Sequence, residues 1–237
     1  MKLKYDFHLH SCLSPCGDND MTPYNLVNMA KLMGYDIIAL TDHNTCLNCP
    51  AAIKAGEEAG ITVVPGMELC TSEEIHTVCL FPTLEKALSF SEYVKSTMPF
   101  IKNQEEIFGE QRIMDHLDNI LGYEDILLTT ASGISIDDVV SEVAKFDGVV
   151  FPAHLDRASY SVLSVLGFMY PEMNFTCAEF THKAFIPQYE EKHKLLKGMK
   201  HLRNSDAHYL ENMVEASCEI DIPECTAQAV VDYISGK

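Results

Sequence analysis

The stretch Asp6-Phe7-His8-Leu9-His10 places two histidines at alternate positions at the end of an apolar, strand-like run. Successive side chains of a β-strand point to opposite faces, so His8 and His10 lie on one side of the strand and can converge on one ion. Such a pair by itself is also typical of a solvated strand face. Other segments of the chain must therefore decide whether the pair belongs to a metal site.

Five further apolar runs carry a histidine or a carboxylate at one end. They are Thr41-Asp42-His43, Gly66-Met67-Glu68, the run that begins at His76, Pro152-Ala153-His154 and Asn204-Ser205-Asp206-Ala207-His208. Imidazole and carboxylate groups suit Zn²⁺, Mn²⁺ and Fe²⁺ alike, and a carboxylate such as that of Glu68 can bridge two cations. The sequence therefore predicts a site for two or three divalent metal ions, with Zn, Mn or Fe left open.

Strand-like and helix-like segments alternate along most of the chain. Strand-like runs span 3–8, 36–41, 62–67, 76–81, 148–153, 176–181, 201–205 and 216–222, and helical patterns follow Pro23, Pro50 and Asp138. This order predicts an α/β fold with a parallel sheet, and its many repeats favour a distorted TIM-like barrel over an open sheet. Barrel enzymes carry their ligands at the carboxyl ends of strands. His76 instead begins its strand, so a strand reversal or a barrel irregularity is needed to bring it to the same rim.

The domain organisation follows from the length and from one break in the alternation. At 237 residues, with 47% hydrophobic residues, we expect a single domain over 1–237. Between about 83 and 130 the rhythm changes, and two or three helices, at 84–93 and 104–121, are expected in an insertion. This insertion is interpreted either as a lid over the site or as a stabilising surface element.

The composition limits the choice of partners and compartment. The 17 Lys and Arg residues against 35 Asp and Glu residues give a formal charge of -18, from which we expect no long duplex nucleic acid as a partner, although a small phosphorylated substrate stays possible. The N-terminus has no apolar signal core and no run of eighteen apolar residues occurs, so a cytoplasmic protein without membrane contact is expected. Because the cytoplasm is reducing, the nine cysteines are interpreted mainly as free thiols rather than as disulfides. The oligomeric state stays open.

Over nearly its whole length the chain resembles the polymerase and histidinol phosphatase (PHP) family. The motifs that carry the resemblance are, in order, D-x-H-x-H-S, P, T-D-H, G-x-E, a strand histidine, A-H and S-D-A-H. The details around His43 and Glu68 are more similar to its nucleotide-phosphatase and oligonucleotidase-like branch. The resemblance implies a distorted (β/α)7 barrel that holds three metals in a cleft. It places one ion between His8, His10, Glu68 and Asp206, a second at Glu68, His76 and His154, and a third at His43 and His208.

The remaining ligand of the third ion is where the chain departs from the family. Members usually have Asp or His shortly after the His-x-His-Ser, whereas here three extra residues precede Pro23 in Ser14-Pro15-Cys16-Gly17-Asp18-Asn19-Asp20. Cys16, Asp18 and Asp20 are all open as this ligand, and between the two aspartates we favour Asp20. The same loop brings cysteines near a second loop, and Cys12, Cys16, Cys46 and Cys49 have the spacing of a tetrathiolate knuckle, although packing or ligation by a single thiolate is the preferred interpretation.

The expected reaction is phosphoester hydrolysis of a small phosphomonoester or short nucleotide, in which hydroxide held between the ions bridged by Glu68 attacks phosphorus. Arg157 is expected to donate hydrogen bonds to the substrate, its alternative being an ion pair with Asp156 or another surface carboxylate. His182 is a candidate acid or substrate contact, or else a packed or partly solvated histidine. Asp6 either orients a ligand imidazole or is satisfied by backbone donors.

Two other functions remain open. A metal-dependent amidohydrolase would also carry His-x-His on its first strand, but such enzymes commonly add a bridging lysine, and no lysine ends a strand near the expected site. A non-catalytic, metal-stabilised PHP module is the third possibility, against which the intact ligand set counts.

Overall fold

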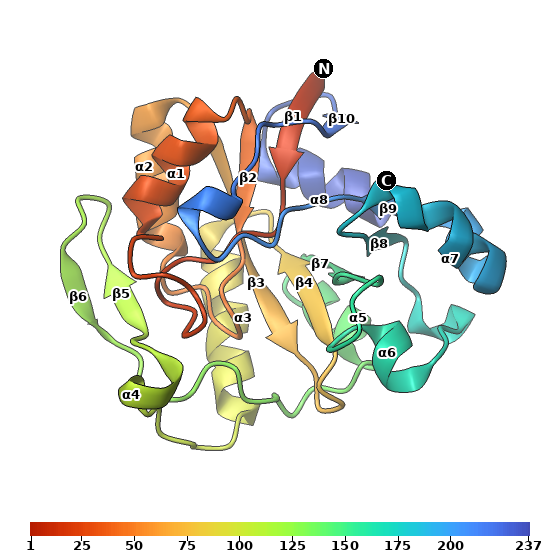
Figure 1. The fold of residues 1–237 in the computed structure, drawn as a ribbon, viewed down its shortest axis with the longest axis horizontal. Helices are drawn as coiled ribbons and strands as arrows, with labels where there is room; N and C mark the ends of the chain where they lie inside the picture. The colour runs from red at the N-terminus through yellow and green to blue at the C-terminus, as the bar shows by residue number, and fades with distance from the viewer.

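In the computed structural model, which describes residues 1–237, six strands form the main sheet in the order β10-β1-β2-β3-β4-β7 (Figure 1). Their bounds are β1 Lys2–Asp6, β2 Ile37–Leu40, β3 Thr62–Cys70, β4 His76–Leu80, β7 Val149–Pro152 and β10 Glu219–Asp221. β1, β2 and β3 are parallel, whereas β4 is antiparallel to both β3 and β7, and β10 is antiparallel to β1. The α/β prediction is confirmed, but the sheet is mixed rather than parallel throughout.

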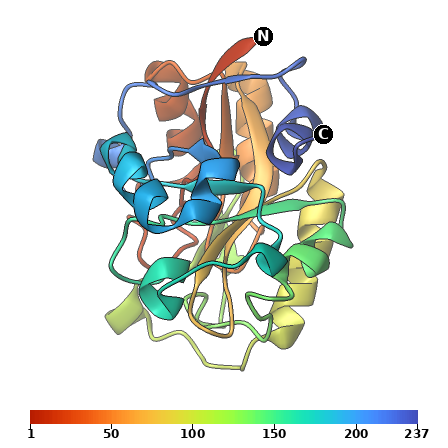
Figure 2. The same cartoon turned by 90° about the vertical axis from the view of Figure 1, so that its right-hand side faces the viewer.

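Two short parallel strands continue the curvature of this sheet. β8 (Cys177–Glu179) and β9 (Lys200–Leu202) pair with each other, and the Leu155 N–H after β7 donates to the Glu179 carbonyl at 2.9 Å. Beyond β9 the chain returns to β1, where Leu9 and Ala207 form a parallel bridge. The strands therefore curl into a half-barrel rather than an open, flat sheet. α6 (Val162–Leu166) and α7 (Ile186–Lys192) lie in front of it in Figure 2.

Helices on the outer face pack on a large apolar core. They are α1 (Pro23–Leu32), α2 (Cys49–Ala59), α3 (Leu84–Thr97) and α5 (Val139–Ala144). α1 begins as its sequence predicts: Thr22 Oγ1 accepts from the Asn25 N–H at 3.2 Å, and Pro23 occupies the first turn, where its missing N–H is not needed. These helices hold the strands from outside and leave the strand ends free.

The inner face of the half-barrel is covered by α8 (Ala227–Ser235), which Figure 1 shows between β1 and the β8–β9 pair. Val64 of β3, Phe151 of β7 and Val230 of α8 belong to one buried apolar cluster. Because side chains alternate along a strand, Glu68 lies on the same face as Val64, nearer the carboxyl end of β3. The candidate ligands therefore occupy the open end of a filled half-barrel.

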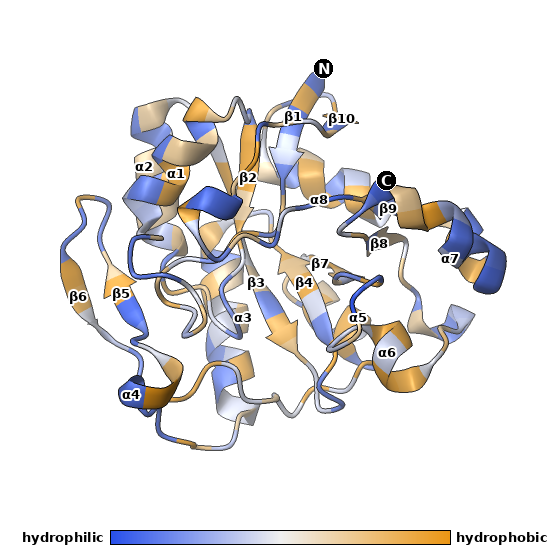
Figure 3. Cartoon of the chain, in the orientation of Figure 1, coloured by the Kyte–Doolittle hydropathy of each residue, from blue (hydrophilic) through white to orange (hydrophobic).

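The insertion between β4 and β7 differs from its predicted helices. After α3 come the short α4 (Glu105–Phe108) and a hairpin of β5 (Arg112–Met114) and β6 (Ile120–Tyr123), so the helix expected over 104–121 is wrong. The Asp115 carboxylate accepts the N–H groups of Leu117 and Asn119, which closes a turn where a helix was expected. The apolar side chains that suggested a helix are exposed on the hairpin, which Figure 3 shows in orange at β6.

None of the helices combines the length and the hydropathy that a membrane span requires.

Candidate metal centre

The reversal of β4 places its first residue at the carboxyl end of β3. In the antiparallel register Cys70 faces His76 and Glu68 faces Val78, so His76 lies on the rim although it begins its strand. The Ala153 N–H donates to the His76 carbonyl at 3.1 Å, which brings the chain leading to His154 to the same rim. His76 therefore reaches the rim because β4 runs antiparallel to β3.

Glu68 forms the centre of the site. Its side chain is 1% exposed, and five imidazoles surround its two oxygens. At Oε1 the distances are 3.2 Å to His8 Nε2, 3.0 Å to His76 Nδ1 and 3.1 Å to His154 Nε2, and at Oε2 they are 3.0 Å to His43 Nδ1 and 3.4 Å to His10 Nε2. One buried carboxylate thus contacts ligand candidates from four other segments of the chain.

Asp206 and His208 complete the cluster from the last segment. Asp206 Oδ1 lies 3.1 Å from His10 Nε2 and 3.4 Å from His8 Nε2, while the imidazole of His208 stacks on that of His10 at 4.1 Å between ring centroids. Three overlapping groups have ligand atoms within 4.8 Å of one another: His8, His10, Glu68 and Asp206; His43, Glu68 and His76; and His10, His43 and His208. The first group has the residues expected for the first ion, and the third contains both residues expected for the third ion, whereas the second contains His43 where His154 was expected.

The polar atoms of this cluster fit a metal centre. His8 Nε2, His10 Nε2, His43 Nδ1, His76 Nδ1 and Asp206 Oδ1 are buried, and although each lies within 3.4 Å of another polar atom of the cluster, none of these contacts has the geometry of a hydrogen bond. Buried polar atoms are almost always paired, because leaving one unpaired costs about 1–3 kcal/mol. Five such atoms around one carboxylate are explained if divalent cations are the missing partners.

The pKa shifts in the cluster follow from burial and from the neighbouring charges. Burial raises the pKa of Glu68, but the imidazoles of His76, His8 and His43 outweigh it, so the pKa is held well below its usual range. Burial lowers the pKa of His8, yet Glu179, Asp206 and Glu68 raise it well above 6.5. Glu68 is therefore ionised at neutral pH and available to a cation.

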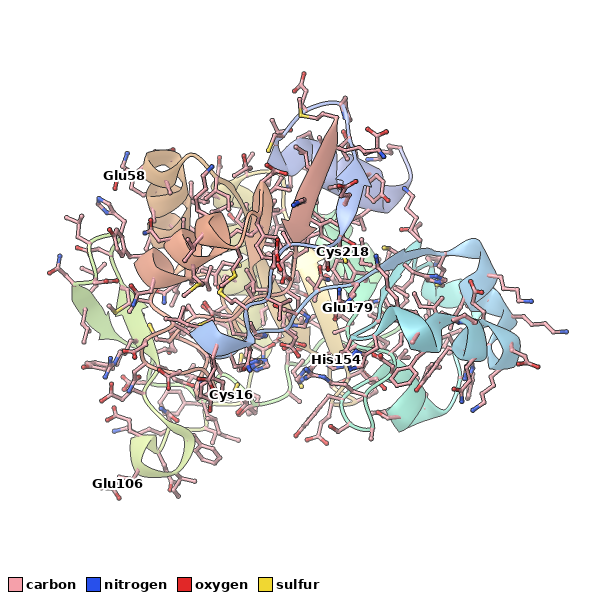
Figure 4. All side chains as sticks on the ribbon, turned by 45° about the horizontal axis from the view of Figure 1, so that its top comes forward. Cys16, Glu58, Glu106, His154, Glu179 and Cys218 are labelled. Carbon is pink, nitrogen blue, oxygen red and sulfur yellow. The ribbon has the colours of Figure 1, made fainter.

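Glu179 is a site residue that the sequence analysis missed. Its carboxylate, 1% exposed, lies 3.0 Å from His8 Nδ1, accepts the His154 N–H at 2.8 Å and accepts Asn204 Nδ2 at 2.6 Å. A carboxylate on the far nitrogen of a ligand imidazole fixes its tautomer and its orientation. The available signal was a carboxylate within an otherwise apolar strand, Cys177-Ala178-Glu179-Phe180. Figure 4 shows Glu179 close to His154.

Asp6 was a candidate for that orienting role, and the structure gives it the alternative one. Its carboxylate accepts the backbone N–H groups of His8 and Ser205, each at 3.2 Å. Burial raises the pKa of Asp6 to about 6 against the effect of these donors. Asp6 thus ties the segment before His8 to the segment before Asp206.

Asp42 organises the loop that follows His10. It accepts the N–H and the hydroxyl of Ser11, each at 2.7 Å, and the hydroxyl of Ser14 at 2.7 Å. Ser14 Oγ also lies 3.0 Å from His10 Nδ1, so the ring of His10 is held on the side away from Glu68. This network gives Ser11 and Ser14 a structural role beside His10.

The structure does not bring Asp20 to the cluster, contrary to the preferred sequence interpretation. Asp20 is exposed, and its N–H donates to Asp18 Oδ1 at 2.8 Å within a tight turn that directs the side chain outward. Cys16 Sγ instead lies 3.2 Å from His43 Nε2. Desolvation raises the pKa of the Cys16 thiol, but His43 and His208 outweigh it and lower the pKa to about 6.

The tetrathiolate knuckle is not assembled. The thiols of Cys46 and Cys49 are buried and donate to the Gly66 carbonyl at 3.1 and 3.5 Å, while that of Cys12 points to the Arg112 carbonyl at 4.0 Å. Packing explains these three cysteines, in line with the preferred interpretation of the sequence.

Arg157 and His182 behave differently from each other. Arg157 Nη1 lies 2.5 Å from Asp206 Oδ2, with the Arg157 side chain 43% exposed, so it reaches the cluster as the partner of a ligand candidate. His182 is exposed, its ring packs edge-on against Phe185, and its N–H donates to Asp156. The turn held by Asp156 directs His182 away from the cluster, so the structure does not place it in the site.

Tyr160 lies at the mouth of the site and carried no sequence signal. Its ring stacks on that of His76 with 4.6 Å between centroids, and its carbonyl accepts the His76 N–H at 2.8 Å. The residue is 48% exposed and has a φ of +56°, a left-handed backbone that a bulky residue rarely adopts. His154 and Asp206 share this feature, with φ of +29° and +52°. Such strain concentrates at functional sites.

The family model of the PHP domain matches residues 6–217, which include every ligand candidate described above. The chain belongs to the PHP domain family. The resemblance to the PHP family that the sequence motifs indicated is thereby confirmed.

Relatives of this PHP chain match it over part of their length. A 5'-3' exoribonuclease of Haemophilus influenzae is 39% identical over 83 residues, 34% of this chain and 29% of the relative. An uncharacterised protein of Methanocaldococcus jannaschii is 33% identical over 102 residues, 39% of this chain and 60% of that protein. The match thus spans less than two thirds of either relative.

Solved structures share the fold of this PHP chain. A lesion-specific endonuclease of Pyrococcus furiosus has a TM-score of 0.70 at 18% identity, covering 100% of this chain and 56% of the endonuclease. A proposed metal-dependent phosphoesterase of Bifidobacterium adolescentis has a TM-score of 0.60 at 17% identity, covering 97% and 94%. At these identities the likeness shows the fold alone.

The expectation that long duplex nucleic acid is not a partner is wrong. An endonuclease Q solved with a 27-mer duplex has a TM-score of 0.64 at 17% identity, covering 100% of this chain and 57% of that protein, and a sequence relative is an exoribonuclease. The error lay in using net charge, which sums the whole surface. Contact with a phosphate backbone depends on local charge, and bound cations offset carboxylates such as Glu68 and Asp206 at the site itself.

Proposed function

We propose that residues 1–237 form a single-domain, metal-dependent phosphoesterase that hydrolyses a small phosphomonoester or the phosphate ester of a short nucleotide. The observation that carries this proposal is the arrangement of five imidazoles around the buried Glu68, with Asp206 beside it. In this proposal the ligands of two or three ions are the residues His8, His10, His43, Glu68, His76, His154, Asp206 and His208.

Divalent ions of any of the three candidate metals would supply the same chemistry at this site. When bound, divalent ions lower the pKa of a coordinated water and offset the charge on phosphate oxygens. Glu68 and Asp206 supply the negative charge that retains them, and Glu179 holds His8 in the orientation that presents Nε2. No nucleophilic side chain is required for hydrolysis. The Zn, Mn or Fe identity of the ions does not follow from this donor set.

Arg157 provides the contact to the substrate. Its Nη1 contacts Asp206 Oδ2, and the side chain is 43% exposed, so a phosphate at the mouth would offer the guanidinium a second acceptor. If Asp206 held a cation, Arg157 would be free to donate to a non-bridging phosphate oxygen. The exposed ring of Tyr160 beside His76 offers a stacking surface for a base, which supports a nucleotide over a simple sugar phosphate.

The test is a substrate panel on protein loaded in turn with Mn²⁺, Zn²⁺ or Fe²⁺. It includes p-nitrophenyl phosphate, bis-p-nitrophenyl phosphate, mononucleotides, 5'-phosphorylated oligonucleotides and duplex DNA. We expect turnover of at least one phosphoester, lost in His10→Ala and retained in Glu124→Gln, whose carboxylate pairs with Lys95 away from the centre.

Each other outcome rejects the proposal in a different way. Hydrolysis of amide substrates in the absence of phosphoester turnover would identify an amidohydrolase. A raised melting temperature on metal addition, with no turnover of any substrate, would identify a metal-stabilised module. No lysine lies within 4.0 Å of Glu68 or Asp206, which counts against the amidohydrolase arrangement described above.

A further inference from the structure

The loop between β1 and α1 carries a thiol to the third group of ligand candidates. Cys16 Sγ lies 3.2 Å from His43 Nε2, and the ligand nitrogens of His10, His43 and His208 lie within 4.8 Å of one another. Of the nine cysteines in the chain, Cys16 is the one that contacts a ligand candidate by its side chain. Figure 4 shows it at the edge of the cluster, across from His154.

Hydrogen bonds on both sides of Cys16 fix its position. Before it, Ser14 Oγ donates a hydrogen bond to Asp42 Oδ1 and accepts one from the His43 N–H at 3.2 Å. After it, the Asp18 N–H donates to the His208 carbonyl at 2.9 Å. The loop is therefore tied directly to the backbones of both histidines, and the thiol cannot move far from their rings.

Tight packing holds the same loop. A Cβ at Gly17 would lie 2.6 Å from the Ser11 carbonyl oxygen, so that position requires glycine for the chain to turn back. Gly109, at the end of α4, approaches the Pro15 carbonyl equally closely, with 2.6 Å to a built Cβ. The insertion thus supports the loop from outside, although it does not contact the histidines.

The distance fits two ligands of one ion. With a metal–sulfur bond of about 2.3 Å and a metal–nitrogen bond of about 2.0 Å, ligand atoms at tetrahedral angles lie about 3.5 Å apart. The 3.2 Å between Cys16 Sγ and His43 Nε2 is close to that separation. The carboxylates of Asp18 and Asp20, the other candidates in the loop, have no contact with an imidazole of the cluster.

We propose that Cys16 is a thiolate ligand of the ion held by His43 and His208, in place of the Asp or His that the family usually has in this loop. This inference rests on the metal centre of the proposed function. A donor set of two imidazoles and one thiolate selects a borderline-soft divalent cation, such as Zn²⁺, Fe²⁺ or Co²⁺, over Mn²⁺ or Mg²⁺ at this position.

The test is a titration of metal-free protein with Co²⁺, followed by absorption spectroscopy. Thiolate ligation gives a sulfur-to-cobalt charge-transfer band in the near ultraviolet, whereas imidazole and carboxylate ligands give visible d–d bands. We expect the charge-transfer band in the native protein and in Cys225→Ser, a control that removes a thiol remote from the cluster. Cys16→Ser and Cys16→Asp should lose the band and keep the d–d bands.

The failures of the two proposals can be told apart. Visible d–d bands in the native protein without a charge-transfer band would overturn the role of Cys16 and leave the metal centre intact. Absence of any cobalt bands would overturn both.

Alkylation supplies a second readout. Cys16 is exposed, so iodoacetamide and peptide mapping can follow it in every sample. We expect Zn²⁺ to slow its alkylation while Mg²⁺ does not; equal rates with and without Zn²⁺ would contradict ligation.

Discussion

Replacement of Glu179 by glutamine tests whether this buried carboxylate orients the metal ligands. Both oxygens of Glu179 accept hydrogen bonds: Oε2 from the His154 N–H at 2.8 Å and Oε1 from Asn204 Nδ2 at 2.6 Å. Glutamine keeps one acceptor oxygen, so one of these donors loses its partner. Asn204 cannot compensate by rotating its amide, because its Oδ1 already accepts the Phe7 N–H at 2.8 Å.

The expected loss has two parts of different origin. One buried donor without a partner destabilises the metal-free protein by about 1–3 kcal/mol. Weaker support of His8 lowers metal affinity by about 10- to 100-fold, the usual effect of removing a group that orients a ligand. That change corresponds to about 1.4–2.8 kcal/mol of binding free energy.

The assay measures both quantities separately. Urea unfolding of the metal-free variants gives the first, and competition with a chromophoric chelator for Zn²⁺ gives the second. Glu124→Gln is the matched control, because it removes another buried carboxylate, with its own backbone and lysine partners, away from the cluster. If Glu179→Gln loses stability but binds Zn²⁺ as tightly as Glu124→Gln does, the orienting role of Glu179 is refuted.

Three further outcomes are expected. The pKa values of His8 and His43 lie well above 6.5 in the metal-free protein, so these imidazoles must lose protons before they bind; metal affinity should rise with pH above 6.5 and calorimetry should detect proton release, whereas a flat profile would contradict the shifts. Arg157→Ala should raise KM for phosphoesters more than it lowers kcat, and unchanged kinetics would remove Arg157 from the substrate contact. Phe151→Ala, in the fully buried inner core, should destabilise the protein by about 3–5 kcal/mol in urea without changing metal stoichiometry; a smaller loss would mean that α8 relaxes into the cavity.

Several elements of the fold and the site could be predicted because they depend on local order along the chain. The alternation of apolar runs with helical patterns indicated an α/β fold, and residues at strand ends, such as His10 and Glu68, marked the rim. The reversal of β4 was one of two possibilities, the other being a barrel irregularity, since His76 begins its run and must still reach that rim. Local periodicity fixes the face and the end of a strand on which a side chain lies.

The hairpin β5–β6 was not predictable in this way. Its apolar residues suggested a helix, but Leu117 and Ile120 are exposed, so burial does not explain their spacing. The turn depends on hydrogen bonds from Asp115, and the hairpin base on Gln111 Nε2, which donates to the Glu124 and Ile126 carbonyls at 2.7 Å. Side-chain contacts of this kind compete with helix periodicity without leaving a periodic signal of their own.

The sequence by itself determined which residue types lie at the strand ends, because alternate side chains of a strand point to the same face. Those residue types, imidazoles and carboxylates, in turn indicate metal-dependent chemistry. Tertiary structure decided which loop and neighbouring residues join them. Cys16 rather than Asp20 meets His43, Glu179 rather than Asp6 holds His8, and His182 points away. Those choices depend on how loops close between distant strands, and the distances involved arise when the half-barrel curls, not from spacing along the chain.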